Sequence, residues 1–168
     1  MFYNRVFETA YFVTLDEHLA QDVVQETFLK AFRNIDKLKD GTKMGAWLAV
    51  IATRTALDLL KKTRNIVITE ESFIDEEISK NSHTPSVENV VEEKYIKNLL
   101  RQQVQELIPE HRQVVVLKYE YDLNYEEIAK ELGISTGTVK SRLYRAKQKL
   151  KLRLEKEPAF QNRGAYYG

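Results

Sequence analysis

The residues most able to do chemistry lie near the end of the 168-residue chain, in a run of bases without an acid. Residues 133–153, GISTGTVKSRLYRAKQKLKLR, contain Lys140, Arg142, Arg145, Lys147, Lys149, Lys151 and Arg153. Such side chains bind the phosphates of nucleic acid, and an arginine can also pair with the edge of a guanine. The run therefore predicts DNA binding; the competing interpretation is a basic face that only solubilises a helix.

The residues before this run predict the element that presents it. Tyr125–Leu132 has apolar and small residues at helical spacing, and Gly133 can end that helix. Ser135 or Thr136 can then cap a second helix. A small residue, a glycine and an apolar residue at positions 129, 133 and 139 have the spacing of a helix-turn-helix. The side chains expected to face solvent or a major groove are Thr136, Thr138, Lys140, Ser141, Arg142, Tyr144 and Arg145, with Lys147, Lys149 and Lys151 expected to hold phosphates.

Composition excludes several other kinds of site. The chain has no cysteine, which excludes disulfides and thiolate metal ligands, and its histidines, His18, His83 and His111, lack ligand spacing. No run approaches the roughly 18 apolar residues of a membrane helix, and the start lacks the features of a signal peptide. We therefore expect a soluble cytoplasmic protein with no metal, no cofactor and no membrane insertion.

Helices are the elements that must position these residues. Only 6 glycines, 3 prolines and few alternating patterns favour an all-α fold. Val114–Tyr121 is rich in β-branched and aromatic residues, which leaves a strand open there, but Pro109 at a helix start favours a helix. Asp16 can cap a helix whose apolar stripe comprises Leu19, Val23, Phe28, Ala31 and Ile35. The expected helices are Tyr3–Val13, Glu17–Ile35, Lys43–Lys62, Val87–Leu107, one from Pro109, Tyr125–Leu132 and the basic helix.

The charges divide the chain into unlike zones that a net charge of +1 conceals. Between Glu70 and Glu93, 8 acids accompany a single lysine or arginine, Lys80, and helical periodicity fails from about Thr63 to Ser86. We predict two small helical domains joined by this acidic, flexible linker, the second domain being the helix-turn-helix. The expected boundaries are 1–64, 65–90 for the linker, 91–156, and a flexible tail at 157–168.

Three stretches together carry a family resemblance: DVVQETFLKAF from residue 22, GAWLAVIATRTALDLLKK from residue 45, and YEEIAKELGISTGTVKSRLYRAKQKL from residue 125. With them the chain resembles the sigma-70 family of bacterial RNA polymerase initiation factors, and more narrowly its extracytoplasmic-function group, which keeps only the second and fourth sigma domains. The resemblance runs from about Tyr3 to Leu154. It implies a second domain that is incomplete at its N-terminus.

The resemblance implies a polymerase-binding surface in the first half of the chain. Asp22, Gln25 and Glu26 match the acidic and amide stretch that docks on the clamp helices of the polymerase largest subunit. Asp22 and Glu26, four residues apart on a helix, place like charges on one face, which a basic partner would relieve. From the residues alone, a solvated face in which Lys30 compensates Glu26 is an equal alternative.

The resemblance also implies two promoter-reading surfaces. Residues 36–43 match the loop that captures a flipped base, and Trp47 matches the tryptophan before the promoter-melting helix, although its helical spacing favours a core position. Arg54 departs from the asparagine that relatives commonly carry, so the base preference does not transfer. The expected contacts to the minus-10 element are Lys43, Trp47, Arg54, Asp58 and Lys61. Those to the minus-35 element are Thr136, Thr138, Lys140, Ser141, Arg142, Tyr144, Arg145 and Lys149.

The predicted function is that of a sigma factor that binds core RNA polymerase and promoter DNA and has no catalytic residues. The resemblance implies an anti-sigma factor as a further partner, and we expect a monomer when the chain is free. One alternative is a stand-alone helix-turn-helix regulator, which would bind duplex DNA without polymerase. The other is an enzyme using the carboxylates near Asp22 and Glu26, which no histidine, metal set or phosphate loop supports.

Overall fold

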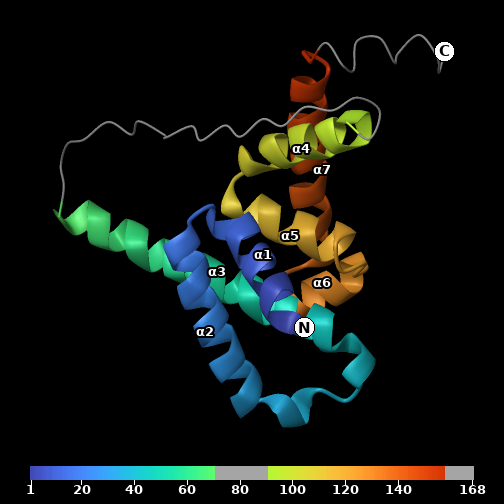
Figure 1. Cartoon of the computed structure of the whole chain (residues 1–168). Helices are drawn as coiled ribbons and strands as arrows, with labels where there is room; N and C mark the ends of the chain where they lie inside the picture. Colours follow the sequence, from blue (N-terminus) through green and yellow to red (C-terminus); the bar gives the residue numbers. More distant parts are fainter. Residues whose placement is uncertain (71–90, 158–168) are drawn as a thin grey trace.

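The protein is described by a computed structural model covering residues 1–70 and 91–157, with only the backbone described at 65–70 and 91–97. Most of the predicted linker and tail lie outside these residues. Regular structure in the described part of the chain is entirely helical, which confirms the all-α prediction (Figure 1). The elements are α1 (Phe2–Thr14), α2 (Glu17–Arg33), η1 (Ile35–Lys37), η2 (Gly41–Lys43), α3 (Met44–Glu70), α4 (Val91–Gln105), α5 (Pro109–Tyr119), α6 (Tyr125–Leu132) and α7 (Thr136–Leu154).

Local signals set most helix ends. The Asp16 side chain accepts a hydrogen bond from the Leu19 amide at 2.9 Å, as expected of an N-cap. Pro109 begins α5, so the strand alternative for Val114–Tyr121 is wrong. The helix wins because a proline at the first helical position sets φ and loses no hydrogen bond there.

The N-terminal unit, α1 to α3 with η1 and η2, is a three-helix arrangement in which each long helix packs on the other two (Figure 1). The predicted apolar stripe on α2 is partly wrong. Phe28 has 36% of its surface exposed, and Ile35 lies beyond the end of the helix and is also exposed. The core face of α2 instead buries Ala20, Val23, Val24, Thr27 and Ala31. Because these small side chains let the helices approach closely, the larger side chains of Phe28 and Ile35 lie outside this core.

The C-terminal unit, α4 to α7, places α5 and α6 against α7, with α4 crossing the far end of α7 (Figure 1). The two units do not stand apart in this structure. α1 and α3 both pack on α5, and one buried apolar cluster runs from Val6 in α1 to Leu143 in α7. The surfaces expected to bind DNA therefore lie on a single body.

Candidate nucleic-acid interface

The turn between α6 and α7 has the geometry of a helix-turn-helix. Gly133 ends α6 with φ 65°, in the left-handed region that favours glycine. Asn124 and Glu127 begin α6 with a reciprocal capping box, at 2.8 and 2.9 Å. The Ser135 side chain accepts from the Thr138 amide at 3.0 Å, so of the two expected caps Ser135 is the one used. These bonds fix where α7 begins relative to α6.

α7 turns its apolar stripe inward and its bases outward. Val139, Leu143 and Ala146 are buried, as the spacing predicted. Thr138 is half-buried, and its hydroxyl lies 2.9 Å from that of Ser135. The Ser141 hydroxyl donates to the Thr138 carbonyl at 3.1 Å. Arg142 is half-buried, whereas the other expected groove-facing residues are exposed: Thr136, Lys140, Ser141, Tyr144 and Arg145.

Two tyrosines organise lysines beside this surface, an arrangement that the sequence did not reveal. The ammonium groups of Lys118 and Lys140 lie 5.3 and 5.8 Å from the centre of the Tyr125 ring. Lys147 lies 5.9 Å from the Tyr119 ring, whose hydroxyl raises the pKa of this lysine. Contacts of this kind hold a cation over an aromatic face and leave it open to a further anion. Lys118 thus joins the candidate phosphate-binding residues, although it is distant from the basic run in sequence.

The basic surface also acts on a histidine beneath it. His111, half-buried in α5, has its pKa lowered first by burial and then by the positive charges of Arg142 and Arg145. The imidazole is therefore neutral over more of the pH range than a free histidine. A bound anion would offset the two arginine charges.

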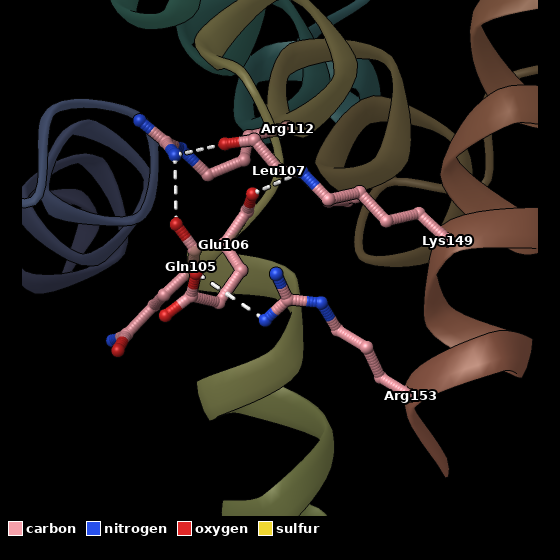
Figure 2. A network of polar contacts seen from close by, with 6 residues as sticks. All are labelled: Gln105, Glu106, Leu107, Arg112, Lys149 and Arg153. Carbon is pink, nitrogen blue, oxygen red and sulfur yellow. Dashed lines mark hydrogen bonds and ion pairs between the residues drawn. The ribbon is translucent and has the colours of Figure 1, made fainter. Parts of the chain in front are cut away.

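Three cations meet the carbonyl end of α4 (Figure 2). Lys149 Nζ donates to the Glu106 carbonyl at 2.9 Å, and an Arg153 Nη1 lies 3.3 Å from the Glu106 carboxylate. Arg112 donates from Nη1 to the Gln105 carbonyl at 3.0 Å. Positive charges stabilise the end of a helix, where unpaired carbonyls gather. Lys149 is exposed but engaged within the chain, and its role as a DNA contact stays a prediction.

The residues expected to bind polymerase lie together on the exposed face of α2. Asp22, Gln25 and Glu26 are all exposed. Lys30 lies 3.5 Å from the Glu26 carboxylate, as the solvated-face alternative required, and it also donates to the buried Thr55 hydroxyl at 3.1 Å. Because Glu26 and Lys30 are both substantially exposed, this ion pair contributes little to stability.

A group of exposed apolar side chains lies next to these acids, and the predicted apolar stripe of α2 did not reveal it. Leu29 and Phe32 extend from α2 with 54% and 83% of their surface exposed, and Ile35 follows in η1. A group of large apolar side chains in solvent is typical of a protein-binding surface. The signal was present in the sequence, since these residues are offset from the small residues that form the core face.

Two of the expected minus-10 residues, Lys43 and Trp47, line a groove between the two units. The groove, of about 400 Å³, is lined on one side by Lys37, Lys39, Lys43 and Trp47, and on the other by Leu123, Glu127, Lys130 and Glu131. Trp47 is half-buried and packs against the core, as its spacing favoured. Arg54 is exposed and donates from Nη1 to the Glu131 carbonyl at 3.1 Å.

The remaining positions on α3 divide between the surface and the core. Asp58 and Lys61 are exposed, as expected of DNA-contacting residues, whereas the neighbouring Thr53 is fully buried. Its hydroxyl donates to the Val50 carbonyl at 3.2 Å, which allows burial without an unpaired donor. Within residues 1–70 and 91–157, no three His, Asp or Glu side chains are grouped to hold a metal ion.

Comparison with known proteins tests the family resemblance. Residues 1–66 match the family profile Sigma-70 region 2, and residues 97–150 match Sigma-70, region 4. Two relatives from Bacillus subtilis are the ECF RNA polymerase sigma factors SigM and SigW. SigM is 31% identical to this chain, and the match covers 90% of this chain and 89% of SigM. SigW is 30% identical, and the match covers 90% of this chain and 83% of SigW. The chain belongs to the sigma-70 family. It is an RNA polymerase sigma factor of the extracytoplasmic-function group, and the stand-alone regulator is not favoured.

Two further comparisons bear on length and fold. The chain is 33% identical to the ECF sigma factor SigE of Mycolicibacterium smegmatis, but it spans only 56% of that relative's length. It is similar in fold to the sigma factor RpoE of Bartonella quintana, solved in complex with the anti-sigma factor NepR, with a TM-score of 0.63 and 93% coverage of both chains at 24% identity. The described helices of this sigma factor include none with the length and apolarity needed to cross a membrane.

Proposed function

We propose that this sigma factor binds core RNA polymerase through the exposed face of α2 and reads two promoter elements, one with each unit. The observation that carries the proposal is the clustering of suitable side chains on three separate surfaces in the order that the matched regions predict. The chain would act as a monomer in the cytoplasm, without catalytic chemistry of its own.

The polymerase contact is proposed for Asp22, Gln25 and Glu26 together with the apolar side chains of Leu29 and Phe32. Buried apolar area supplies affinity at a protein interface, whereas complementary charge mainly sets orientation and association rate. An acidic patch bordering exposed apolar residues fits a partner that is basic at one edge and apolar at its centre. This arrangement accounts for the exposure of Phe32, which no packing within the described chain explains.

The minus-35 contact is proposed for the exposed side of α7. Arg142 and Arg145 would pair with guanine edges, and Lys118 and Lys147, whose ammonium groups lie near tyrosine rings, would bind phosphates. Lys149 would exchange the Glu106 carbonyl for a phosphate oxygen, since hydrogen bonds to charged acceptors are stronger. The full proposed set is Thr136, Thr138, Lys140, Ser141, Arg142, Tyr144, Arg145 and Lys149, with Lys118 and Lys147 added.

The minus-10 contact is proposed for Lys43, Trp47, Arg54, Asp58 and Lys61. A groove with an aromatic ring and flanking lysines has the components that capture a single-stranded base. Because Arg54 can only donate hydrogen bonds, it would favour base edges that accept them. The domain boundaries at 1–64, 65–90 and 91–156 remain our proposal for the division of labour. An anti-sigma factor is proposed as a further partner, supported by the complex in which the similar RpoE was solved.

Run-off transcription tests the proposed function. Purified chain would be added to core polymerase with a library of promoter fragments from the genome that encodes it. We expect transcripts that start at defined sites and that core polymerase alone does not make. If the chain adds no promoter-specific transcript, the proposal is wrong, even if the chain binds duplex DNA by itself.

A further inference from the structure

A cavity of about 270 Å³ lies between α1, α4 and α5. It shares no lining residue with the surfaces proposed to bind polymerase and DNA. A cavity of about 150 Å³ in a protein core accepts benzene, so this one has room for a ligand of roughly 10 to 12 non-hydrogen atoms. The proposed function leaves this cavity without a role.

Arg112 fixes two walls of the cavity. Its side chain is buried, and it donates from Nε and Nη2 to the Val13 carbonyl in α1 at 3.1 and 2.6 Å. From Nη1 it donates to the Gln105 carbonyl at the end of α4 at 3.0 Å (Figure 2). Phe12, next to Val13, and Gln105 itself both line the cavity. The site is therefore formed before a ligand arrives, which lowers the entropy cost of binding.

Aromatic side chains form the apolar part of the lining. Phe12 and Tyr121 are half-buried and pack against the core, and the buried Val116 lies with them in the lining. Tyr11 also lines the cavity and has 40% of its surface exposed. Aromatic faces and edges of this kind bind another ring in offset-stacked or edge-to-face geometry. The lining therefore favours a ligand that carries an aromatic ring.

The Tyr121 hydroxyl offers a hydrogen-bond acceptor to such a ligand. The Thr9 hydroxyl donates its single proton to the Arg5 carbonyl at 2.8 Å. The Tyr121 hydroxyl lies 2.7 Å from the Thr9 hydroxyl and must therefore be the donor of that pair. The lone pairs of the Tyr121 oxygen can then accept an N–H group of the ligand.

Two guanidinium and two carboxylate groups also line the cavity. They belong to Arg5, Arg101, Glu8 and Glu120, whose side chains reach solvent. None of the four forms an ion pair with a side chain that the structure describes, and the Arg5 guanidinium lies 5.1 Å from the centre of the Tyr121 ring. A simple anion would approach both carboxylates, and a simple cation would approach both guanidinium groups. Only a zwitterion places an opposite charge beside each kind of group.

We propose that this cavity binds a free α-amino acid with an aromatic side chain. The ring would pack against Phe12 and Tyr121. The carboxylate would bind the Arg101 guanidinium, and the ammonium group would bind Glu8 and the Tyr121 oxygen. The other guanidinium and the other carboxylate of the lining lie beside these pairs. Phenylalanine has the size that the cavity admits, and the site needs neither DNA nor polymerase to bind it.

Three related compounds test the proposal against the full-length chain in ligand-observed NMR titrations. L-Phenylalanine carries both charges, hydrocinnamate lacks the ammonium group, and phenethylamine lacks the carboxylate. We expect a Kd for L-phenylalanine on the order of 0.1 to 1 mM, as is usual for a ligand of this size. Each analogue should bind at least about tenfold more weakly, since each loses a charge-assisted hydrogen bond.

Two results of these titrations would overturn the proposal. One is the absence of binding by phenylalanine, tyrosine and tryptophan at about 10 mM, about tenfold above the weakest expected Kd. The other is equal binding of phenylalanine and its two analogues, which would mean that the cavity accepts any small aromatic molecule.

Two substitutions then assign the charges. Arg101→Gln should weaken binding of phenylalanine by at least about tenfold and should not weaken binding of phenethylamine. Glu8→Gln should weaken binding of phenylalanine by a similar factor and should not weaken binding of hydrocinnamate. Arg33→Gln and Glu17→Gln, identical changes at exposed positions outside the cavity, are the matched controls. If these controls and the cavity variants bind phenylalanine equally at unchanged helicity, the charged groups do not hold the ligand and the proposal is wrong.

The outcome for the ligand is independent of the outcome for transcription. A chain that binds phenylalanine as described but directs no promoter-specific transcript would refute the proposed function and leave the amino-acid site standing. A chain that directs transcription but binds none of the aromatic amino acids would refute only the site.

Discussion

The two glycines that flank the start of α7 make opposite predictions for the same substitution. Gly133 has φ 65°, so an alanine there adopts a left-handed conformation that costs about 1–2 kcal/mol. Part of this cost is returned, because alanine restricts the unfolded chain by about 0.4–1 kcal/mol more than glycine. We expect Gly133→Ala to lower the free energy of unfolding by about 1 kcal/mol, although nothing lies within 4 Å of the added Cβ.

Gly137 lies in the first turn of α7 with a helical backbone. A Cβ there would meet the Ser135 Oγ at 3.7 Å, an ordinary contact. Since alanine exceeds glycine in helix propensity by up to about 1 kcal/mol, Gly137→Ala should raise the free energy of unfolding by about 0.5 kcal/mol. The two variants should therefore differ by about 1.5 kcal/mol, or about 3–6 °C in Tm for a chain of this size.

Urea unfolding followed by far-ultraviolet circular dichroism measures this difference. The parent chain and both variants should share one slope and differ only in the midpoint. A Gly133→Ala midpoint at or above that of the parent would refute the left-handed turn. If Gly137→Ala lowers the free energy of unfolding as much as Gly133→Ala does, any added Cβ is harmful at this turn. The backbone conformation of Gly133 would then not be the cause.

Three further predictions concern charge. The double charge reversal Asp22→Lys and Glu26→Lys should weaken core-polymerase binding in a pull-down by at least about tenfold, since like charges across an interface cost several kcal/mol. Binding of duplex DNA by α7 should be unchanged, and an equal loss of both activities would contradict separate surfaces. Arg145→Ala should reduce discrimination among minus-35 sequences by about 1–3 kcal/mol, whereas Lys147→Ala should weaken all sequences alike and lower the salt slope by about one in fluorescence anisotropy; identical behaviour would mean that α7 is oriented differently. Because the folded-state pKa of His111 is lowered, the native chain binds fewer protons than the unfolded chain below about pH 6.5 and loses stability there. Between about pH 7.5 and about pH 5.5 the urea midpoint of His111→Gln should therefore fall less than that of the parent chain. An equal fall in both chains would exclude this histidine as the cause.

Local chemistry made the helix-turn-helix predictable from the sequence. Gly133 ends α6 and Ser135 caps α7 within one turn of chain, so both could be predicted from neighbouring residues, and only the choice between Ser135 and Thr136 stayed open. The family motifs likewise lie in continuous stretches, so the resemblance needed no tertiary information. The exposed bases of α7 follow directly from the buried positions of Val139 and Leu143.

What the sequence could not supply depends on contacts between distant residues. Arg112 would be placed on the surface by its type, and its burial follows only from the meeting of α1 with the end of α4. The position of Phe28 was wrongly predicted because the apolar periodicity on α2 does not show how closely small residues let helices approach. The pairing of Lys118 with Tyr125 joins two helices that the basic run does not include.

Arg112 joins the two units through a contact that does not depend on protein concentration. It donates from Nε to the Val13 carbonyl in α1 at 3.1 Å and from Nη1 to the Gln105 carbonyl at the end of α4 at 3.0 Å. Because both units belong to one chain, this contact does not weaken when the protein is diluted, unlike a contact with a separate protein, whose occupancy depends on its concentration relative to Kd. The strength of the contact between the units is therefore a property of the molecule and is the same whether a cell makes little or much of it.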